Sequence, residues 1–434
     1  MKQHKTLLLA ALLLPALYAS AQDNGSNSPY SRYGFGLLNP RTSSYAAASG
    51  ATIAMQGGRE VNFSNPASYA AIDSLTFLFD VGLSLQNANL NEGGRKVNAR
   101  NASIDYVTAG FRAAHNLGFS LGLMPYSTIG YKMVKETLMQ TSTGEVTETD
   151  SYNGSGGLHE AFVGIGWRPF KGFSVGMNAG YFWGANTHTV TATFSDAGMS
   201  SRIRTYDSDI RSYKLDFGLQ YMQRLNERNA LTLGLTYGLG HNINSTARYY
   251  DQTLSGSTYT GDTISCLNAF QLPHTFGAGL MWYHRNRLRL GVDYTFEKWS
   301  KVKSPVLGTG ALGGYTYTAQ TGQYTDRHRI AVGGEYVPDN NSITWSKHIR
   351  YRAGLSYTTP YTRLTGQDGP SNLTASIGVG LPIMNAHSNR CILNFAVQYE
   401  RVSPKVATQV KEQYIRLCLG LSFNEEWFRK WQAR

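Results

Sequence analysis

Segments of alternating apolar and polar residues recur along most of this chain, and they are joined by connections that alternate between short and long. The clearest segment runs from Arg287 to Trp299, where Leu288, Leu290, Val292, Tyr294 and Phe296 alternate with Arg289, Gly291, Asp293, Thr295 and Glu297. Successive side chains of a strand point to opposite faces, so a strand between lipid and a polar lumen has a period of two. Strands of a soluble β-sandwich also alternate between apolar and polar residues, so other features of the chain are needed to distinguish the two classes.

The first residues indicate the compartment. Lys2 and Lys5 precede an apolar run from Leu7 to Leu17 and the small-residue stretch Ala19-Ser20-Ala21. This pattern predicts a secretory signal peptide over residues 1–21. No later apolar run approaches the roughly 18 residues that a spanning helix needs. A membrane form of the mature chain must therefore be a closed barrel, and we expect it in the outer membrane.

The spacing of turns predicts the topology. We expect 14 strands between residues 75 and 424, and several, such as 172–194 and 202–224, exceed the roughly 9 to 11 residues that cross a bilayer. Outer-membrane barrels have short periplasmic turns and long outer loops. The fold prediction is an all-β, 14-stranded antiparallel transmembrane barrel with both termini in the periplasm and a rim beyond the membrane. Short turns are expected at 115–116, 169–171, 225–228 and 285–286, and longer polar loops rich in Gly, Thr, Ser and Asn at 87–101, 137–155, 245–263 and 304–323.

Two segments lie outside the strand pattern. Residues 22–74 are rich in Ser, Ala, Gly, Asn and Tyr and show no strand period, which indicates a compact irregular unit. Residues 425–434 carry Trp427, Trp431 and three basic side chains. This tail fits either an interfacial anchor or a contact with a periplasmic partner.

The formal net charge is +12, and Lys and Arg are scattered singly through the expected strands and loops. Nucleic-acid binding would require basic residues gathered on one face or helix, so this class is not expected. An anionic membrane surface of lipid and lipopolysaccharide, or a general effect on solubility, accounts for the charge.

Charged residues at inward positions of the expected strands predict a charge network in the lumen. Because an unpaired buried charge is costly, we expect these side chains to pair with one another and with Arg32, Arg41 and Arg59 of the segment 22–74. The predicted network consists of Arg289, Asp293, Glu297, Arg352 and Arg416, with Lys214, Asp216 and Glu400 also facing inward.

A series of short motifs carries a family resemblance. Asn65-Pro66-Ala67 stands just before the first expected strand, and Leu272-Pro273, Gly277, Gly279, Asp293, Trp299-Ser300, Tyr351-Arg352-Ala353-Gly354 and Pro360 follow in order. This order resembles the FadL family of outer-membrane transporters for hydrophobic compounds (OMPP1/FadL/TodX type) and its relative PorV, over nearly the whole mature chain. The stretches 28–34 and 423–430 are similar to barrels of Bacteroidota.

The resemblance implies that residues 22–74 fold inside the barrel as a plug, or hatch, whose motif is Asn65, Pro66 and Ala67. It also implies that a hydrophobic molecule is captured at the outer end and passes the hatch. Apolar plug residues that could line such a cavity are Phe35, Leu37, Leu38, Ile53, Met55 and Phe63; packing within the plug is the competing explanation for them.

Catalytic motifs are not found in the sequence. It contains neither a His-Glu-x-x-His helix nor a Cys-x-x-Cys pair, and the Gly-x-Ser-x-Gly pattern occurs only inside expected strands, at 118–122 and 172–176, rather than as an elbow between a strand and a helix. We therefore expect neither an enzyme nor a metal or cofactor site. Two functions remain. The first is uptake of hydrophobic small molecules, such as long-chain fatty acids. The second is a PorV-like accessory or docking role in an outer-membrane secretion or assembly complex.

Overall fold

The computed structural model describes residues 26–426, apart from 75, 142–143, 197, 286, 311–313, 365, 384–390 and 407–408. The predicted signal peptide, the first four residues of the predicted plug and residues 427–434 of the predicted tail lie outside this part of the chain. Within it, no helix has the length and apolar character needed to cross a membrane.

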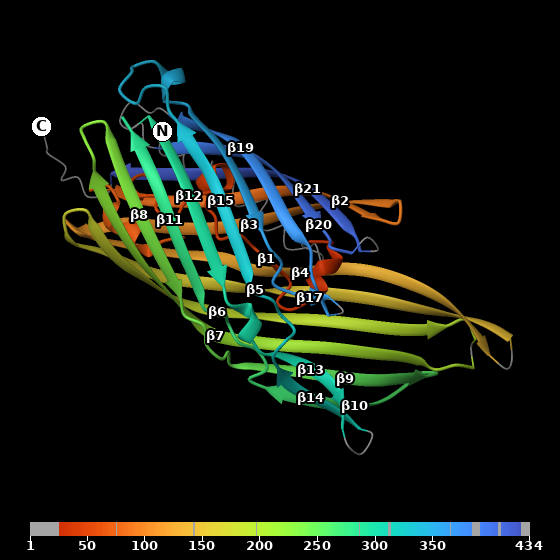
Figure 1. The fold of residues 1–434 in the computed structure, drawn as a ribbon. Helices are drawn as coiled ribbons and strands as arrows, with labels where there is room; N and C mark the ends of the chain where they lie inside the picture. Colours follow the sequence, from red (N-terminus) through yellow and green to blue (C-terminus); the bar gives the residue numbers. More distant parts are fainter. Residues whose placement is uncertain are drawn as a thin grey trace, which may run out of the picture.

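Fourteen strands form one closed antiparallel barrel, as predicted (Figure 1). Each strand pairs with its neighbour along the chain, and β2 closes the wall by pairing with β21. The barrel strands are β2 (Thr76–Glu92), β3 (Arg95–Ala114), β4 (Leu117–Thr141), β5 (Gly144–Phe170), β6 (Phe173–Phe194), β7 (Ser201–Arg224), β8 (Asn229–Gly238), β11 (Thr275–His284), β12 (Leu288–Glu297), β15 (Arg327–Tyr336), β16 (Arg350–Thr358), β19 (Ser371–Ile383), β20 (Cys391–Ser403) and β21 (Lys411–Glu426). Within the described residues the first wall strand runs from Thr76, and β21 continues two residues past the predicted boundary at 424.

The wall shows the expected alternation between two environments. On β12, Leu290, Val292 and Tyr294 are exposed on the outer face, whereas Gly291 and Asp293 are buried on the inner face. Apolar side chains facing outward are what a lipid-embedded wall requires. We call the end of the barrel at the short β3–β4, β5–β6 and β7–β8 connections the turn end, and the opposite end the loop end.

At the loop end the wall extends into a rim on one side. The strands β4 to β7 contain 22 to 27 residues, far longer than β8 or β11. The segment Ser201–Ile210 of β7 pairs with β9 (Ser245–Ser255), which pairs in turn with β10 (Thr258–Leu267). A separate hairpin, β13 (Ser304–Thr309) with β14 (Tyr315–Gln320), lies beside β10, and β17 (Arg363–Leu364) pairs with β18 (Gln367–Asp368) (Figure 1).

The prediction of long polar loops at the loop end was wrong. Residues 87–101 and 137–155 continue the β2–β3 and β4–β5 hairpins, 245–263 holds β9 and part of β10, and 304–323 holds β13 and β14. A strand with water on both faces has no reason to alternate, so the period of two disappears although the pairing continues. On β10, eight of the ten side chains are exposed and the other two are half-buried, whichever face they are on.

The N-terminal segment fills the inside of the barrel (Figure 1). It contains η2 (Pro29–Arg32), β1 (Leu37–Leu38), α2 (Ser44–Ser49) and η3 (Pro66–Ala71). All six residues of α2 are buried, and β1 pairs with Ser127 and Thr128 of β4. Two further short helices, η4 (Trp299–Lys301) and η5 (Trp345–His348), lie in connections of the wall.

Candidate functional site: a lumen sealed by the plug

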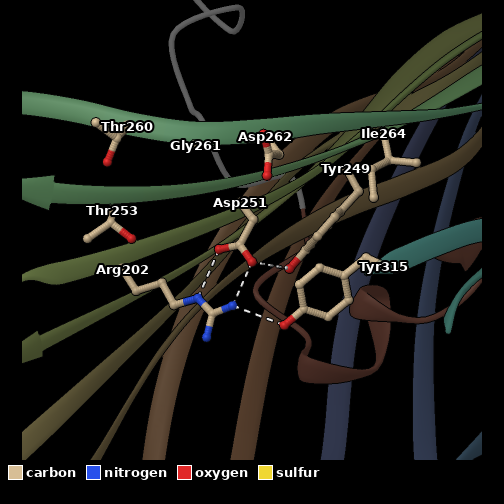
Figure 2. A pocket seen from close by; sticks show the side chains of 9 residues that line it. All are labelled: Arg202, Tyr249, Asp251, Thr253, Thr260, Gly261, Asp262, Ile264 and Tyr315. Carbon is tan, nitrogen blue, oxygen red and sulfur yellow. Dashed lines mark hydrogen bonds and ion pairs between the residues drawn. The ribbon is translucent and has the colours of Figure 1, made fainter. Parts of the chain in front are cut away.

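A polar hollow of about 440 Å³ lies in the rim, between β7, β9, β10 and β14 (Figure 2). Arg202 donates from Nε and Nη2 to the two carboxylate oxygens of Asp251, at 2.9 and 2.6 Å, and from Nη2 to the Tyr315 hydroxyl at 3.1 Å. These charge-assisted hydrogen bonds lower the pKa of Asp251. The hollow is lined by Arg202, Tyr249, Asp251, Thr253, Thr260, Gly261, Asp262, Ile264 and Tyr315, which is not the lining of an apolar capture site.

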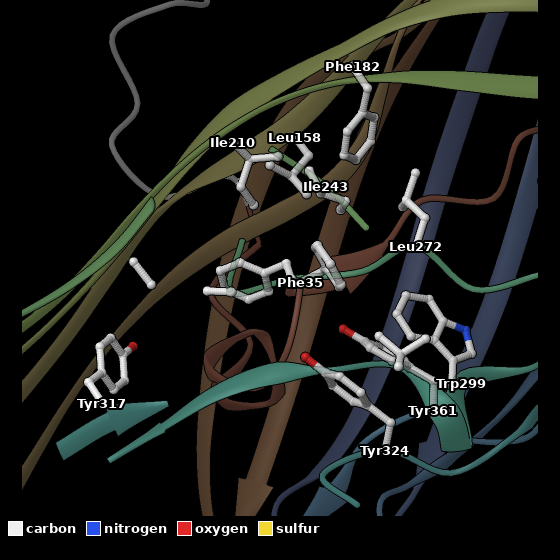
Figure 3. Close-up of a cluster of buried hydrophobic side chains, with 14 of the residues drawn as sticks. Phe35, Leu158, Phe182, Ile210, Ile243, Leu272, Trp299, Tyr317, Tyr324 and Tyr361 are labelled. Carbon is white, nitrogen blue, oxygen red and sulfur yellow. The ribbon is translucent and has the colours of Figure 1, made fainter. Parts of the chain in front are cut away.

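Below the rim, a cluster of aromatic side chains closes the loop end of the lumen (Figure 3). Phe35 of the plug is fully buried, with its ring centroid 5.3 Å from that of Phe270 and 5.6 Å from that of Trp299. Trp299 also contacts Tyr361 at 4.7 Å and Tyr324 at 5.6 Å between centroids. Because these residues come from separate connections of the wall, the cluster ties the plug to several loops at once.

The six apolar plug residues predicted to line a cavity do not share one. Phe35 lies in the aromatic cluster, with Leu38 packed at its edge and Leu37 half-buried in β1. Phe63 packs in a second cluster with Tyr106 and Phe162. In the remaining positions, Met55 joins a third cluster with Tyr45, Ala54 and Met281, and Ile53 is 6% exposed beside Gly277 and Gly279 of β11.

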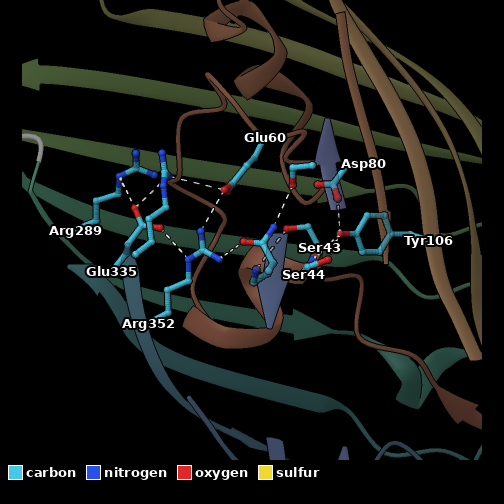
Figure 4. A network of polar contacts seen from close by, with 12 residues as sticks. Ser43, Ser44, Glu60, Asp80, Tyr106, Arg289, Glu335 and Arg352 are labelled. Atoms are coloured by element: carbon cyan, nitrogen blue, oxygen red, sulfur yellow. Dashed lines mark hydrogen bonds and ion pairs between the residues drawn. The ribbon is translucent and has the colours of Figure 1, made fainter. Parts of the chain in front are cut away.

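Toward the turn end, a buried ion network joins the plug to β12, β15 and β16 (Figure 4). Glu335 accepts from Arg352 Nε at 2.8 Å and lies 3.5 Å from both Arg289 Nε and Arg350 Nη1. Glu60 of the plug lies 3.3 Å from Arg352 Nη2 and 3.9 Å from Arg350 Nη1. The side chains of Arg352 and Glu335 are 0% and 1% exposed. Three arginines thus share two carboxylates, so the network carries one excess positive charge, and loss of either carboxylate would leave a further arginine charge uncompensated.

A second ion network anchors the plug to β5 and β7. Arg41 lies 2.8 Å from Asp216 Oδ2 and 3.1 Å from Glu160 Oε1, and Lys214 pairs with the same two carboxylates. The Glu160 side chain is 1% exposed. Here two cations meet two anions, so the network is neutral.

The predicted lumen charges therefore belong to several separate sites. Only Arg289 and Arg352 share a partner, which is Glu335. Asp293 accepts from the backbone amides of Thr52 and Ile53 in the plug, at 2.5 and 2.9 Å. The prediction of a single network was wrong because inward phase fixes the face of a side chain but not its height. Glu297 pairs with Arg327 at 3.0 Å. Arg416 donates to Gln86 and lies 3.7 Å from Glu400.

Of the three plug arginines, Arg41 pairs with the lumen carboxylates Glu160 and Asp216. Arg32 lies over the ring of Tyr152, and Arg59 lies 4.0 Å from Asp73 within the plug segment. The main partners missed from the sequence are Glu335, Glu160, Glu60 and Arg350. The first two share the inward phase of their strands and could have been found by it. Arg350 shares the inward phase of Arg352 and could be found in the same way, whereas Glu60 lies in irregular plug backbone and had no periodic signal.

The hatch motif bonds the plug to the wall. Asn65 caps η3 by accepting from the Ala67 amide at 3.1 Å, and its Nδ2 donates to the carbonyl of Ile53 at 2.8 Å. The same Nδ2 lies 3.2 and 3.4 Å from the wall carbonyls of Leu219 and Leu235. Pro66 and Ala67 follow as the first, fully buried turn of η3. An asparagine here thus serves as both helix cap and wall contact.

Glycines on the inner wall make room for η3. A Cβ added at Gly176 or Gly218 would collide with Pro66 or Asn65, and one at Gly166 would collide with Pro66 and Ala70. Only glycine allows backbone of the plug to lie directly against backbone of the wall at these positions. These glycines could have been identified from the sequence, because they occupy inward positions of predicted strands.

A second hollow, of about 870 Å³, lies on the outer wall rather than in the lumen. It is almost entirely apolar, and the exposed side chains of Trp167 and Leu219 are part of its lining. Its lining is Leu117, Ile165, Trp167, Val175, Gly176, Met177, Phe217, Gly218, Leu219, Leu235, Thr236 and Tyr237.

Among the described residues, no group of three His, Cys, Asp or Glu side chains could hold a metal ion. One serine–histidine contact is present, between Ser212 Oγ and His241 Nε2 at 3.1 Å. The other ring nitrogen of His241 lies near the carbonyl oxygen of Leu239 rather than a carboxylate. This pair lacks the charged orienting group of a hydrolase triad.

Comparison with known proteins agrees with this architecture. A family model described as BamG matches residues 3–433. No curated protein sequence matches the chain significantly. Solved structures of similar fold include a FadL homologue of Pseudomonas aeruginosa (TM-score 0.59, 14% identity, 90% of this chain and 99% of that one) and the toluene transporter TbuX of Ralstonia pickettii (0.59, 14%, 90% and 99%). The toluene transporter TodX of Pseudomonas putida is also similar (0.59, 16%, 91% and 100%). The predicted FadL-like fold of the barrel is confirmed.

Proposed function

This chain belongs to the BamG family, and we propose that it acts as a docking or accessory subunit of an outer-membrane assembly or secretion complex. The observation that carries this proposal is the sealed lumen. In this proposal the turn end, where β21 ends at Glu426, lies in the periplasm, and the rim lies outside the cell. This orientation follows the usual placement of short turns and long loops in outer-membrane barrels. The first described plug residues, Ser28 and Tyr30, instead lie beside Glu412 and Val410 at the loop end, so the expectation of two periplasmic termini stays a prediction.

The seal is built from interactions that are costly to open. The aromatic cluster around Phe35 closes the loop end, and the network of Glu60, Glu335 and Arg352 holds the plug nearer the turn end. Separating one partner of a buried ion pair costs about 3 to 5 kcal/mol. A barrel whose plug is fixed in this way is better suited to present its surfaces to partners than to open at each transport event.

The barrel also offers large surfaces outside the lumen. The rim projects well beyond β8, β11 and β12 (Figure 1), and the outer wall carries the apolar hollow around Trp167 and Leu219. Wall hollows and extramembrane hairpins are surfaces on which other proteins can dock. We propose no catalytic role and no cofactor, because the Ser212–His241 pair lacks a carboxylate.

Passage of a hydrophobic small molecule is the second candidate. It is favoured by the likeness to the toluene transporters, although the low identity supports only a shared fold. Under this alternative, the aromatic cluster around Phe35 and Trp299 is a gate, and a fatty acid or aromatic hydrocarbon must pass it.

The first experiment is native extraction of the tagged, full-length protein in mild detergent, followed by size analysis and mass spectrometry of proteins and small molecules. Docking predicts a protein partner in stoichiometric amount and no enriched apolar ligand. A lone barrel carrying fatty acyl or aromatic molecules would contradict docking and favour passage.

A Trp299→Ala variant sharpens the comparison. Docking predicts the same partners and no new uptake of a radiolabelled fatty acid or toluene, because the lower plug network remains intact. Increased uptake in intact cells, with unchanged barrel assembly, would identify the aromatic cluster as a gate.

A further inference from the structure

One connection at the turn end is unlike the others. Residues 337–349, between β15 and β16, form a long loop that contains η5, whereas the β3–β4 and β5–β6 connections are tight turns. In Figure 1 this loop and its short helix stand beyond the end of the barrel, at the top of the view. It begins directly after the paired, outward-facing Tyr336 and Tyr351. Aromatic side chains in these positions mark the membrane interface, so the loop extends past the membrane.

The loop is held in a defined shape. The indole Nε1 of Trp345 donates to the Pro382 carbonyl at 2.9 Å, which fastens the loop to β19. The Asp339 amide donates to the Lys347 carbonyl at 2.9 Å and closes the base of the loop. The carboxylate of Asp339 lies 3.4 Å from Arg287 of the neighbouring connection. Little conformational entropy would be lost when such a preorganised loop binds a partner.

At the tip of this loop stands Ile343, whose residue surface is 97% exposed. It is more exposed than any other large apolar side chain in the described part of the chain, including those on the outer wall. Single exposed apolar residues are common, but this one is carried clear of the barrel on a rigid support. Apolar side chains presented in this way act as anchors when they enter a pocket on a partner.

The surroundings of the loop are basic. Lys347 is exposed near the base of the loop, and exposed acidic side chains in the described turn-end connections are few, with Glu227 among them. Arginine and lysine at the turn end favour a partner of opposite charge. The basic residues of the turn end are Arg112, Arg168, Lys171, Arg224, Arg228, Arg285, Arg287 and Lys347.

We propose that the loop 337–349 docks a periplasmic protein, with Ile343 entering an apolar pocket that acidic side chains surround on the partner. This inference rests on the proposed docking function and names the element that carries it. Because the loop extends past Tyr336 and Tyr351, we favour a protein over the membrane surface as its binding partner.

The test uses a photo-cross-linking amino acid at position 343 of the tagged full-length protein, in the native membrane. The matched control places it at Leu225, which is 59% exposed on the β7–β8 turn at the same end. We expect position 343, and not 225, to cross-link to one periplasmic protein at an acidic surface. An Ile343→Asp substitution should reduce recovery of that protein roughly tenfold or more, as loss of an interface anchor does. Leu225→Asp and Ile343→Val should leave recovery nearly unchanged.

Three results would overturn the proposal. If the wild-type protein yields stoichiometric partners that Ile343→Asp recovers equally well, docking occurs elsewhere and only the loop assignment fails. Cross-links from 343 to lipid alone would make the loop a membrane anchor. A wild-type protein with no partner would refute the proposed function itself. Heat-modifiable migration of each variant verifies that its barrel has formed.

Discussion

The plugged lumen and the rim both contain ion pairs between arginine and a carboxylate, but these pairs contribute differently to stability. In the lumen, Arg352 and Glu335 are 0% and 1% exposed, and their partners come from the plug and from neighbouring strands. In the rim, Arg211 and Asp209 are 70% and 48% exposed at a distance of 3.7 Å. Exposed pairs contribute about 0 to 1 kcal/mol, whereas breaking a buried pair costs several times more. Position relative to solvent, rather than the residue types, decides which charges hold this molecule together.

The two regions also differ in how backbones approach each other. In the lumen, glycines such as Gly176 let the plug lie directly against the wall. In the rim, a Cβ added at Gly314 would meet no atom within 4 Å. The lumen is thus packed as a protein core, whereas Gly314, between β13 and β14 in the rim, stands in water.

The largest expected effect is that of Glu335→Gln. It leaves Arg289, Arg350 and Arg352 with Glu60 as the remaining carboxylate of the network, and we expect a loss of about 3 to 5 kcal/mol in the free energy of unfolding. Urea unfolding in detergent, followed by tryptophan fluorescence, measures it. The matched rim variant, Asp209→Asn, should unfold like the wild type. Equal effects of the two would abolish the distinction between lumen and rim.

A smaller effect is expected from Gly176→Val. The new side chain collides with Pro66 and forces η3 from the wall, which should cost about 1 to 3 kcal/mol, as overpacking does in cores. Limited proteolysis should then cleave the plug faster while the barrel persists. Gly314→Val, in the rim, is the control. An unchanged cleavage rate in the Gly176 variant would mean that the plug does not rest on this part of the wall.

The smallest effect concerns pH in the rim. Hydrogen bonds from Arg202 lower the pKa of Asp251, so the pair stabilises the rim above the ordinary aspartate pKa of about 3.9. This stabilisation is lost as the pH falls through the lowered value. A spin label at Thr253 should keep constant mobility from neutral pH to about pH 5 and become more mobile below about pH 4. In Asp251→Asn the mobility should no longer depend on pH, and a retained pH response would assign it to another group.

Several features of the lumen could be predicted from the sequence because they depend on local pattern. The inward face of Asp293 follows from the alternation around it, and the place of Asn65-Pro66-Ala67 before the first strand marks the hatch motif. Glu335 and Gly176 also lie in the inward phase and were available to the same reasoning. The contact of Arg352 with Glu60 was not, because it joins a wall strand to a plug residue 292 positions away in the chain.

By itself, the sequence determined that this chain forms a barrel of 14 strands, since a wall between lipid and lumen imposes a period of two on every crossing. Only the tertiary structure decided the arrangement of the rim and of the plugged lumen, where the period of two gives no further information. β10 in the outer part of the rim has water on both faces and has lost the alternation, whereas β9 still buries Ala247 and Tyr249 on one face. The seal of the lumen depends on which side chains meet at one height after the barrel closes. Both are set by strand pairing and stagger, which are long-range properties that a local pattern does not contain.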